Sequence, residues 1–222
     1  MKSFGPLETE SKKDTKELET FPDDTYKVIT EWKMKILACY FCKNQGRFFG
    51  KRRTSLIGFM IVTNSTDNED RQKGIKDVTF VMMVIDDCLQ DDWEVACAKS
   101  IMYKDYLPAH VKKVHFVSDS AGCFKSSLHQ ALQPFWKIWT GVEKVRYRIT
   151  PAGNGKSALD GMFGRLNTVL RGAIDGGLLY WNSATIVTAI EDLNGLASTQ
   201  FARFAPARVR QLEVDISSMS FE

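Results

Sequence analysis

The stretch from Lys112 to Asp175 limits the possible folds more than any other part of the chain. Residues 112–119 form a short apolar run that ends in Asp119, which is typical of a buried strand. Residues 120–139 have helical periodicity with an interruption near Pro134, residues 144–149 alternate basic and apolar side chains, and residues 157–175 form the best amphipathic helix. Strand, helix, strand and helix in this order predict parallel strands with right-handed crossovers.

Three more strands are predicted ahead of this stretch, at 28–39, 55–63 and 78–85, followed by a helix over 86–103. Consecutive strands with short connections indicate an antiparallel meander. The whole pattern predicts an α/β, ribonuclease-H-like fold with a mixed five-stranded sheet, three antiparallel strands then two parallel ones, flanked by helices. In such a sheet the first and fourth strands are neighbours.

The predicted domain covers residues 25–195, after a flexible, acidic and polar arm at 1–24 and before a C-terminal extension at 196–222. Asn182 or Ser183 can cap a last helix that runs to Asp192 and ends at Gly195. The 222 residues contain no run of about 18 apolar residues, so no membrane span is predicted, and the N-terminus lacks the apolar core of a signal peptide.

The five cysteines argue against a disulfide framework, because their number is odd in a chain of this length. Cys39 and Cys42 form an isolated CxxC pair. A zinc site needs further ligands near such a pair, so two packed thiols are the preferred interpretation.

Three carboxylates are candidates for a metal site: Glu31, Asp119 and Asp160. The predicted topology brings together an acid on the first strand, one after the fourth strand and one on the last long helix. Such a set could hold two Mg²⁺ or Mn²⁺ ions and support phosphoryl transfer. Each acid also has a purely structural interpretation. Asp119 could cap a helix, Asp160 could complement a helix dipole, and Glu31 could form a solvent-side salt bridge with Lys33 or Lys35.

Basic residues gather in two places although the net charge is only +3. Residues 43–53 carry five basic residues and no acid, which suits either a polyanionic partner or a solvated loop. Residues 141–172 carry six basic residues against Glu143 and Asp160. The candidate DNA contacts are Lys51, Arg52, Arg53, Lys125, Lys156, Arg165 and Arg171. The segment 153–157 (GNGKS) lacks the first glycine of a nucleotide-binding phosphate loop, so no nucleotide cofactor is expected.

Several segments together resemble the catalytic core of eukaryotic DDE/D transposases, a group of transposon-derived proteins with a ribonuclease-H-like domain. The matching segments are 32–35 (WKMK), 48–51 (FFGK), 117–122 (VSDSAG) with 125–126 (KS), and 155–164 (GKSALDGMFG). The resemblance spans about residues 26 to 195 and implies cutting and joining of DNA with Mg²⁺. It makes Asp119 the second acid of the active site and Asp160 the third.

The first acid departs from the family pattern, which has Asp directly before the WKMK segment, where Glu31 stands here. A side chain one methylene longer would displace an ion by about 1 Å, and misplacement on that scale can cost roughly 10²-fold in rate. The usual DNA-targeting domain is also missing from these residues. Both departures suggest a fragment, or a decayed or domesticated copy, and leave open whether the chain is an enzyme.

Three functions therefore remain open from the sequence. The first is a transposase-like domain with DNA as partner, nuclear if the source is eukaryotic and able to form a homo-oligomer. The second is a catalytically inactive DNA- or protein-binding remnant. The third is a plain ribonuclease-H-type nuclease that acts on RNA–DNA hybrids.

Overall fold

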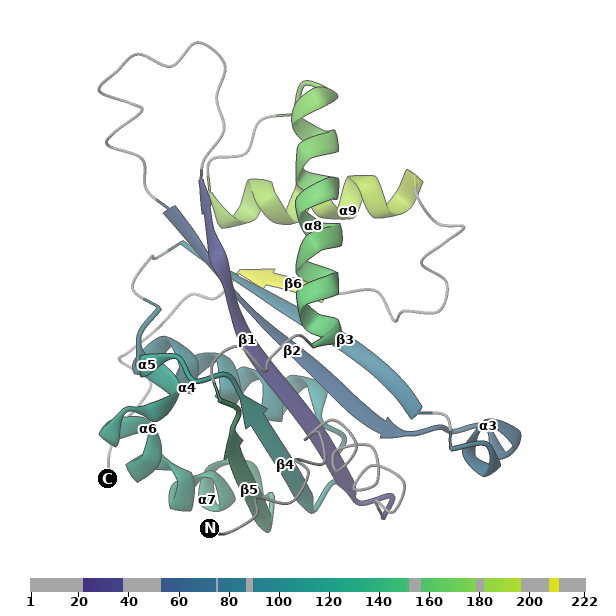
Figure 1. The fold of residues 1–222 in the computed structure, drawn as a ribbon, viewed down its shortest axis with the longest axis vertical. Helices are drawn as coiled ribbons and strands as arrows, with labels where there is room; N and C mark the ends of the chain where they lie inside the picture. The colour runs from purple at the N-terminus through teal and green to yellow at the C-terminus, as the bar shows by residue number, and fades with distance from the viewer. Residues whose placement is uncertain are drawn as a thin grey trace, which may run out of the picture.

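A computed structural model describes residues 22–37, 53–74, 76–86, 90–151, 157–178, 182–196 and 208–211. Its centre is a six-stranded sheet with the order β5-β4-β1-β2-β3-β6, shown in Figure 1. The strands are β1 (Thr25–Leu37), β2 (Arg53–Asn64), β3 (Lys76–Ile85), β4 (Lys113–Ser118), β5 (Lys144–Ile149) and β6 (Arg208–Gln211).

The strand directions confirm the predicted ribonuclease-H-like fold. β1, β2 and β3 form the antiparallel meander, and β4 and β5 add to it in parallel on the free side of β1. As predicted, the first and fourth strands are neighbours at the centre of the sheet. One element was not predicted: β6 pairs in parallel with β3 and makes a sixth strand from residues of the C-terminal extension.

The sheet is covered on both faces, and each face has its own core. Side chains from β1 to β4 that point to one face pack with α4 (Asp92–Ile101), α5 (Gly122–Lys125), α6 (Ser127–Leu132) and α7 (Trp136–Thr140). Alternate side chains point to the other face and pack with α8 (Ala158–Asp175) and α9 (Ser183–Leu196). We call these the α4–α7 face and the α8 face. Burial of both faces explains the nearly continuous apolar sequence of β3.

The first helix is shorter than predicted. Asp91 is its N-cap and accepts a hydrogen bond from the backbone N–H of Glu94, so the helix begins at Asp92 instead of at residue 86. Beyond Ile101 the chain continues as a π-helical turn over Met102–Tyr106. Trp93, near the start of this helix, is 39% exposed.

The predicted helix over 120–139 is broken into pieces. It begins at Gly122, stops at Ser126, whose hydroxyl caps α6, and changes to a 3-10 turn over Gln133–Phe135 before α7. The interruption at Pro134 was predicted; the one at Ser126 was not. A further short helix, α3 (Asn68–Gln72), lies in the connection between β2 and β3 and was not predicted.

The last two helices lie on the α8 face, as Figure 1 shows. Ser157 caps α8, and Asp160 completes a capping box with it. The Asn182 side chain accepts a hydrogen bond from the N–H of Thr185 at the start of α9, as predicted. The helix continues to Leu196, past Gly195, so the predicted end was wrong. Asp86, at the end of β3, accepts hydrogen bonds from the backbone N–H and hydroxyl of Ser183 and ties α9 to the sheet.

Several predictions lie outside the described residues: the arm up to residue 21, the Cys39–Cys42 pair, most of the basic segment 43–53 and the glycine-rich loop before Ser157. The domain boundaries at 24/25 and 195/196 stay predictions. Among the described helices, none is long and apolar enough to cross a membrane.

Candidate metal and nucleic-acid site

Glu31 lies on β1, and Asp119 directly follows the last residue of the neighbouring parallel strand β4. Thr30 of β1 pairs with Ser118 of β4, and the two acids are the next residues along each chain. Adjacent strands lie about 4.8 Å apart, and residues paired in a parallel sheet point to the same face. The alternation along β1 places Glu31 on the α8 face, because Val28 and Trp32 pack on the other face.

Helix α8 brings Asp160 to the same place. On β2, the residue paired with Glu31 is Gly58. A Cβ built on Gly58 would lie 2.8 Å from Cζ of Phe163 and 2.9 Å from Cδ1 of Leu159, so only glycine lets the first turns of α8 pack this closely on the sheet. Asp160 belongs to those first turns.

The electrostatics of Glu31 show that the three acids share one environment. Its side chain is only 8% exposed. Burial, together with the negative charges of Asp160 and Asp119, raises the pKa of Glu31 to about 7, although a hydrogen bond with the Ser157 side chain lowers it. A carboxylate that is buried beside two like charges favours either a proton or a cation. The structure thus brings the two aspartates within electrostatic range of Glu31, and the role of the three acids as metal ligands stays a prediction.

The two aspartates already have backbone partners. Asp119 Oδ1 accepts a hydrogen bond of 3.0 Å from the N–H of Ala121, and Asp160 Oδ2 accepts one of 3.2 Å from the N–H of Ser157. Asp119 does not cap α5, whose N-cap is Ala121, whereas Asp160 does have the helix-end role considered as its alternative. Within the described ranges, no group of three acidic, histidine or cysteine side chains is arranged to hold a metal ion. Binding an ion would therefore require the aspartates to turn toward Glu31.

Ser157 is a site residue that the sequence analysis missed. Its hydroxyl accepts a hydrogen bond from the N–H of Leu159, its side chain bonds to Glu31, and its own N–H binds Asp160. One residue thus connects the first acid to the third. The spacing Ser157-x-x-Asp160 is a capping-box pattern and could have identified it.

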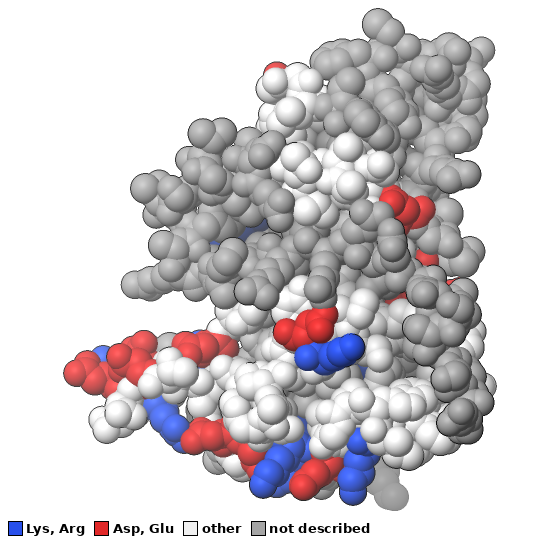
Figure 2. Space-filling model, turned by 180° about the vertical axis from the view of Figure 1, so that it is seen from behind, with Lys and Arg blue, Asp and Glu red and all other residues white. Residues whose placement is uncertain are grey.

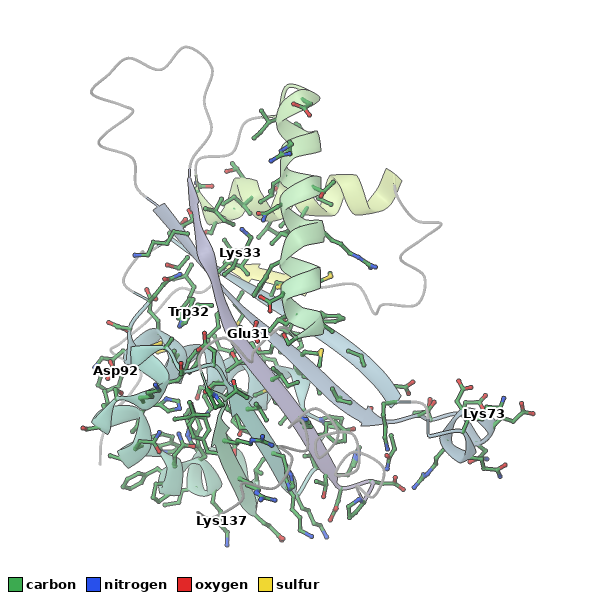
Figure 3. The ribbon with its side chains drawn as sticks, in the orientation of Figure 1. Glu31, Trp32, Lys33, Lys73, Asp92 and Lys137 are labelled. Carbon is green, nitrogen blue, oxygen red and sulfur yellow. The ribbon has the colours of Figure 1, made fainter. Side chains whose placement is uncertain are left out.

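The solvent-side interpretation of Glu31 was wrong. Figure 3 shows Glu31 and Lys33 along β1 beside α8, and both side chains are 8% exposed. Burial also lowers the pKa of Lys33. The sequence alternates like a strand with one wet face, but α8 lies over that face.

The end of β4 that carries Asp119 is held by β5. The hydroxyl of Tyr147 lies 2.8 Å from Ser118 Oγ and donates to the carbonyl of Phe124 at 3.1 Å. Thr150 donates to the carbonyl of Ser118 from both its N–H and its hydroxyl. These bonds fix the chain on both sides of Asp119.

Behind this strand end lies a buried lysine. Lys99 Nζ is 4.0 Å from the ring centre of Phe116 and 4.9 Å from that of Trp136, and among the described residues it has no hydrogen-bond partner. Complete burial lowers the pKa of Lys99 to about 7. Burial and the charge of Lys99 lower the pKa of His129 to about 4. These rings stabilise the lysine by cation–π attraction.

The predicted DNA contacts are only partly described. Lys125, at the end of α5, is exposed, as are Arg165 and Arg171 on α8. Lys51, Arg52 and Lys156 lie outside the described residues, and Arg53 begins β2 without a described side chain. The structure therefore leaves most of this set as a prediction.

Comparisons with known proteins give little beyond the fold. No protein-family model matches the chain, and no curated protein does. Among solved structures, the chain is similar to the crystal structure of LC9-RNase H1, a type 1 RNase H with the type 2 active-site motif. The TM-score is 0.40 at 12% sequence identity, over 89% of this chain and 92% of that chain. The fold assignment rests on the strand order and directions described above, and no function is inferred from this similarity.

Proposed function

We propose that this chain is a transposase-like domain that cleaves and joins DNA strands with divalent metal ions. The observation that carries the proposal is the approach of Asp160 and Asp119 to Glu31, a carboxyl group whose pKa is raised first by burial and then by these two negative charges. The sequence resemblance to DDE/D transposases supports the choice of DNA as substrate. The acids come from β1, the end of β4 and the start of α8, as expected for such a site.

Glu31, Asp119 and Asp160 are the residues that would hold Mg²⁺ or Mn²⁺. Bound ions would stabilise the negative charge that develops on phosphorus oxygens during strand cleavage. Ser157 orients Glu31, and the hydrogen bonds made by β5 keep Asp119 at the strand end. Because the pKa of Glu31 lies near 7, ion binding at or below neutral pH would release its proton.

The direct test is nicking of supercoiled plasmid DNA by the purified chain with Mn²⁺. Asp119→Ala and Asp160→Ala should abolish nicking. Asp175→Ala is the matched control, since it removes an exposed acid from the other end of the same helix. If the two site variants nick as fast as wild type, any observed activity comes from elsewhere and the assignment is wrong.

A second candidate is a catalytically inactive, DNA- or protein-binding remnant. It is favoured by Glu31 in place of the family's Asp and by the aspartate carboxylates that bond to their own backbone. Glu31→Asp should then create Mn²⁺ binding or nicking that the wild type lacks. Measurable turnover by the wild type would exclude this candidate. Parallel cleavage assays with an RNA–DNA hybrid and with duplex DNA distinguish these two candidates from a plain ribonuclease-H-type nuclease, which would cleave the hybrid.

A further inference from the structure

A row of basic residues crosses three strands on the α8 face. Lys27 of β1 pairs with His115 of β4, and His115 pairs with Arg146 of β5. Their sequence neighbours Val28, Phe116 and Tyr147 belong to the core of the α4–α7 face. By the alternation of strand side chains, the three basic residues therefore point to the opposite face.

This row leads toward the acids. Two residues further along, Ile29, Val117 and Arg148 form the next row of the same face, and Arg148 adds another cation. Glu31 and Asp119 follow after two more residues. At about 3.3 Å per residue, Lys27 lies roughly 13 Å from Glu31 along β1. That span corresponds to about four nucleotides at 3.4 Å each along one DNA strand.

Helices α8 and α9 pack on the other strands of the sheet and do not lie over β4 and β5 (Figure 1). Helix α8 packs on β1 and β2, and α9 packs on β3 and β6. Figure 1 shows β4 and β5 beside these helices rather than beneath them. Arg146 is exposed, His115 and Arg148 are half-buried, and Lys27 is buried. The arginines could therefore touch a ligand, while Lys27 would contribute charge from below.

The two rows of paired positions next to the acids contain no acidic residue. Figure 2 shows basic and acidic side chains interspersed along the lower part of the molecule as seen from behind. On the α8 face, the two rows of paired strand positions next to the acids hold basic and apolar residues: Lys27, Ile29, His115, Val117, Arg146 and Arg148. Lys27, His115, Arg146 and Arg148 already have interactions within the chain, so a ligand would add to these contacts or compete with them.

We propose that the α8-side surface of β1, β4 and β5, with Arg146 and Arg148 as its contact residues, binds the phosphate backbone of the DNA strand that enters the acid site. The inference rests on the proposed function for the identity of the strand. Arginine suits this role because its planar guanidinium group forms paired hydrogen bonds with phosphate oxygens. The DNA backbone would lie over the basic row and would approach the acids only at the site where metal ions could bind.

The test compares two double variants that remove the same charge. Arg146→Gln/Arg148→Gln changes the proposed surface, and Lys73→Gln/Lys137→Gln changes two exposed lysines that Figure 3 places at the periphery, far from Glu31. Binding of a fluorescent DNA duplex is measured by anisotropy in EDTA, over a range of salt concentrations. The arginine pair should weaken binding ten- to hundredfold and reduce the salt slope by about 1.8, which is two phosphate contacts at about 0.9 each. The lysine pair should change binding less than threefold.

Equal losses in the two double variants, or no DNA binding by the wild type, would overturn the proposal. Thermal unfolding of each variant shows whether a loss reflects misfolding, and single Arg146→Lys should then retain part of the affinity. Because the assay contains no metal ion, it is independent of catalysis. If the wild type does not nick DNA but only the arginine double variant loses DNA affinity, the proposed activity is contradicted and the binding surface is not. If the wild type nicks DNA and the arginine double variant binds DNA as well as wild type, the binding surface is contradicted and the activity is not. A chain that binds a polyglutamate peptide in preference to DNA would show that the surface serves an acidic protein, contrary to the proposal.

Discussion

Replacing Glu31 with glutamine should stabilise the metal-free protein at alkaline pH. The folded chain raises the pKa of Glu31 from an ordinary value of 4.5 to about 7. A carboxyl group with a raised pKa in the folded state destabilises folding progressively as pH rises from 4.5 to 7, and the full penalty is present above pH 7. At about 1.4 kcal/mol per pKa unit, the penalty is at most about 3.4 kcal/mol, and local relaxation should reduce it to about 2–3 kcal/mol.

The assay is thermal and urea unfolding of both proteins in EDTA at pH 5 and pH 8. At pH 8 we expect Glu31→Gln to unfold at a temperature about 5–10 °C higher than wild type, since about 1 kcal/mol corresponds to roughly 2–4 °C in a chain of this size. At pH 5 the difference should fall below about 1 kcal/mol, because this pH lies only about half a unit above the ordinary pKa of 4.5, so folding then costs little ionisation of the carboxyl group.

Manganese should reverse the order of stability. An ion at 1,000 times its dissociation constant stabilises the folded state by about 4.1 kcal/mol, which exceeds the penalty of about 2–3 kcal/mol, and wild type should gain this while the glutamine variant gains little. Glu94→Gln is the control: that buried carboxylate accepts a hydrogen bond from the N–H of Gln90, so its loss should destabilise the protein. A Glu31→Gln protein that is less stable than wild type at pH 8, or differs from it equally at both pH values, would refute the electrostatic argument.

Three further predictions concern the surroundings of the site. Gly58→Ala should destabilise the fold by about 1–3 kcal/mol in urea unfolding, because its Cβ would overlap two α8 side chains, whereas Gly164→Ala, with open space around it, should be neutral or stabilising. Tyr147→Phe should lower the free energy of unfolding by about 1–2 kcal/mol and weaken Mn²⁺ binding measured by calorimetry, because its hydroxyl bonds to residues on both sides of Asp119. Tyr103→Phe removes a buried hydroxyl with no hydrogen-bond partner in the described structure and should leave the stability unchanged. Equal effects of the two substitutions would contradict the role of the Tyr147 hydrogen bonds. Lys99→Met should stabilise the protein most at pH 7. Between pH 7 and about 10, Lys99 is protonated in the unfolded wild type and neutral in the folded one, so the stability of the wild type rises with pH. The stability gained by Lys99→Met should therefore shrink by up to about 1.4 kcal/mol per pH unit over this range. A stability difference that does not change with pH would refute the lowered pKa.

The strand order could be predicted from the sequence because local patterns determine it. Apolar runs and alternation located five strands, and the connections between them allowed few topologies. Asp119 was identifiable for the same reason, since it directly follows an apolar run. The strand β6 was not, because it has only four residues and pairs with a strand distant in the sequence.

The environment of Glu31 could not be predicted from local patterns. Glu31, Lys33 and Lys35 alternate with apolar residues, which in most strands marks a solvated face. Here that face is covered by α8, a helix more than 120 residues later in the chain. Lys99 escaped prediction in the same way, since a lysine on an amphipathic helix ordinarily points to water. The burial of charged groups depends on which remote element packs above them, and no sequence window contains that information.

The pairing of Gly58 with Glu31 makes the position of α8 along the sheet a condition for assembling the site. A side chain at this position would overlap the Phe163 ring and the Leu159 side chain where α8 now packs. Sliding the helix by one turn would move it about 5.4 Å and set the ring against a full-sized residue on β2. Substitution of Gly58 should therefore displace Asp160 relative to Glu31, even though all three carboxylates are still present.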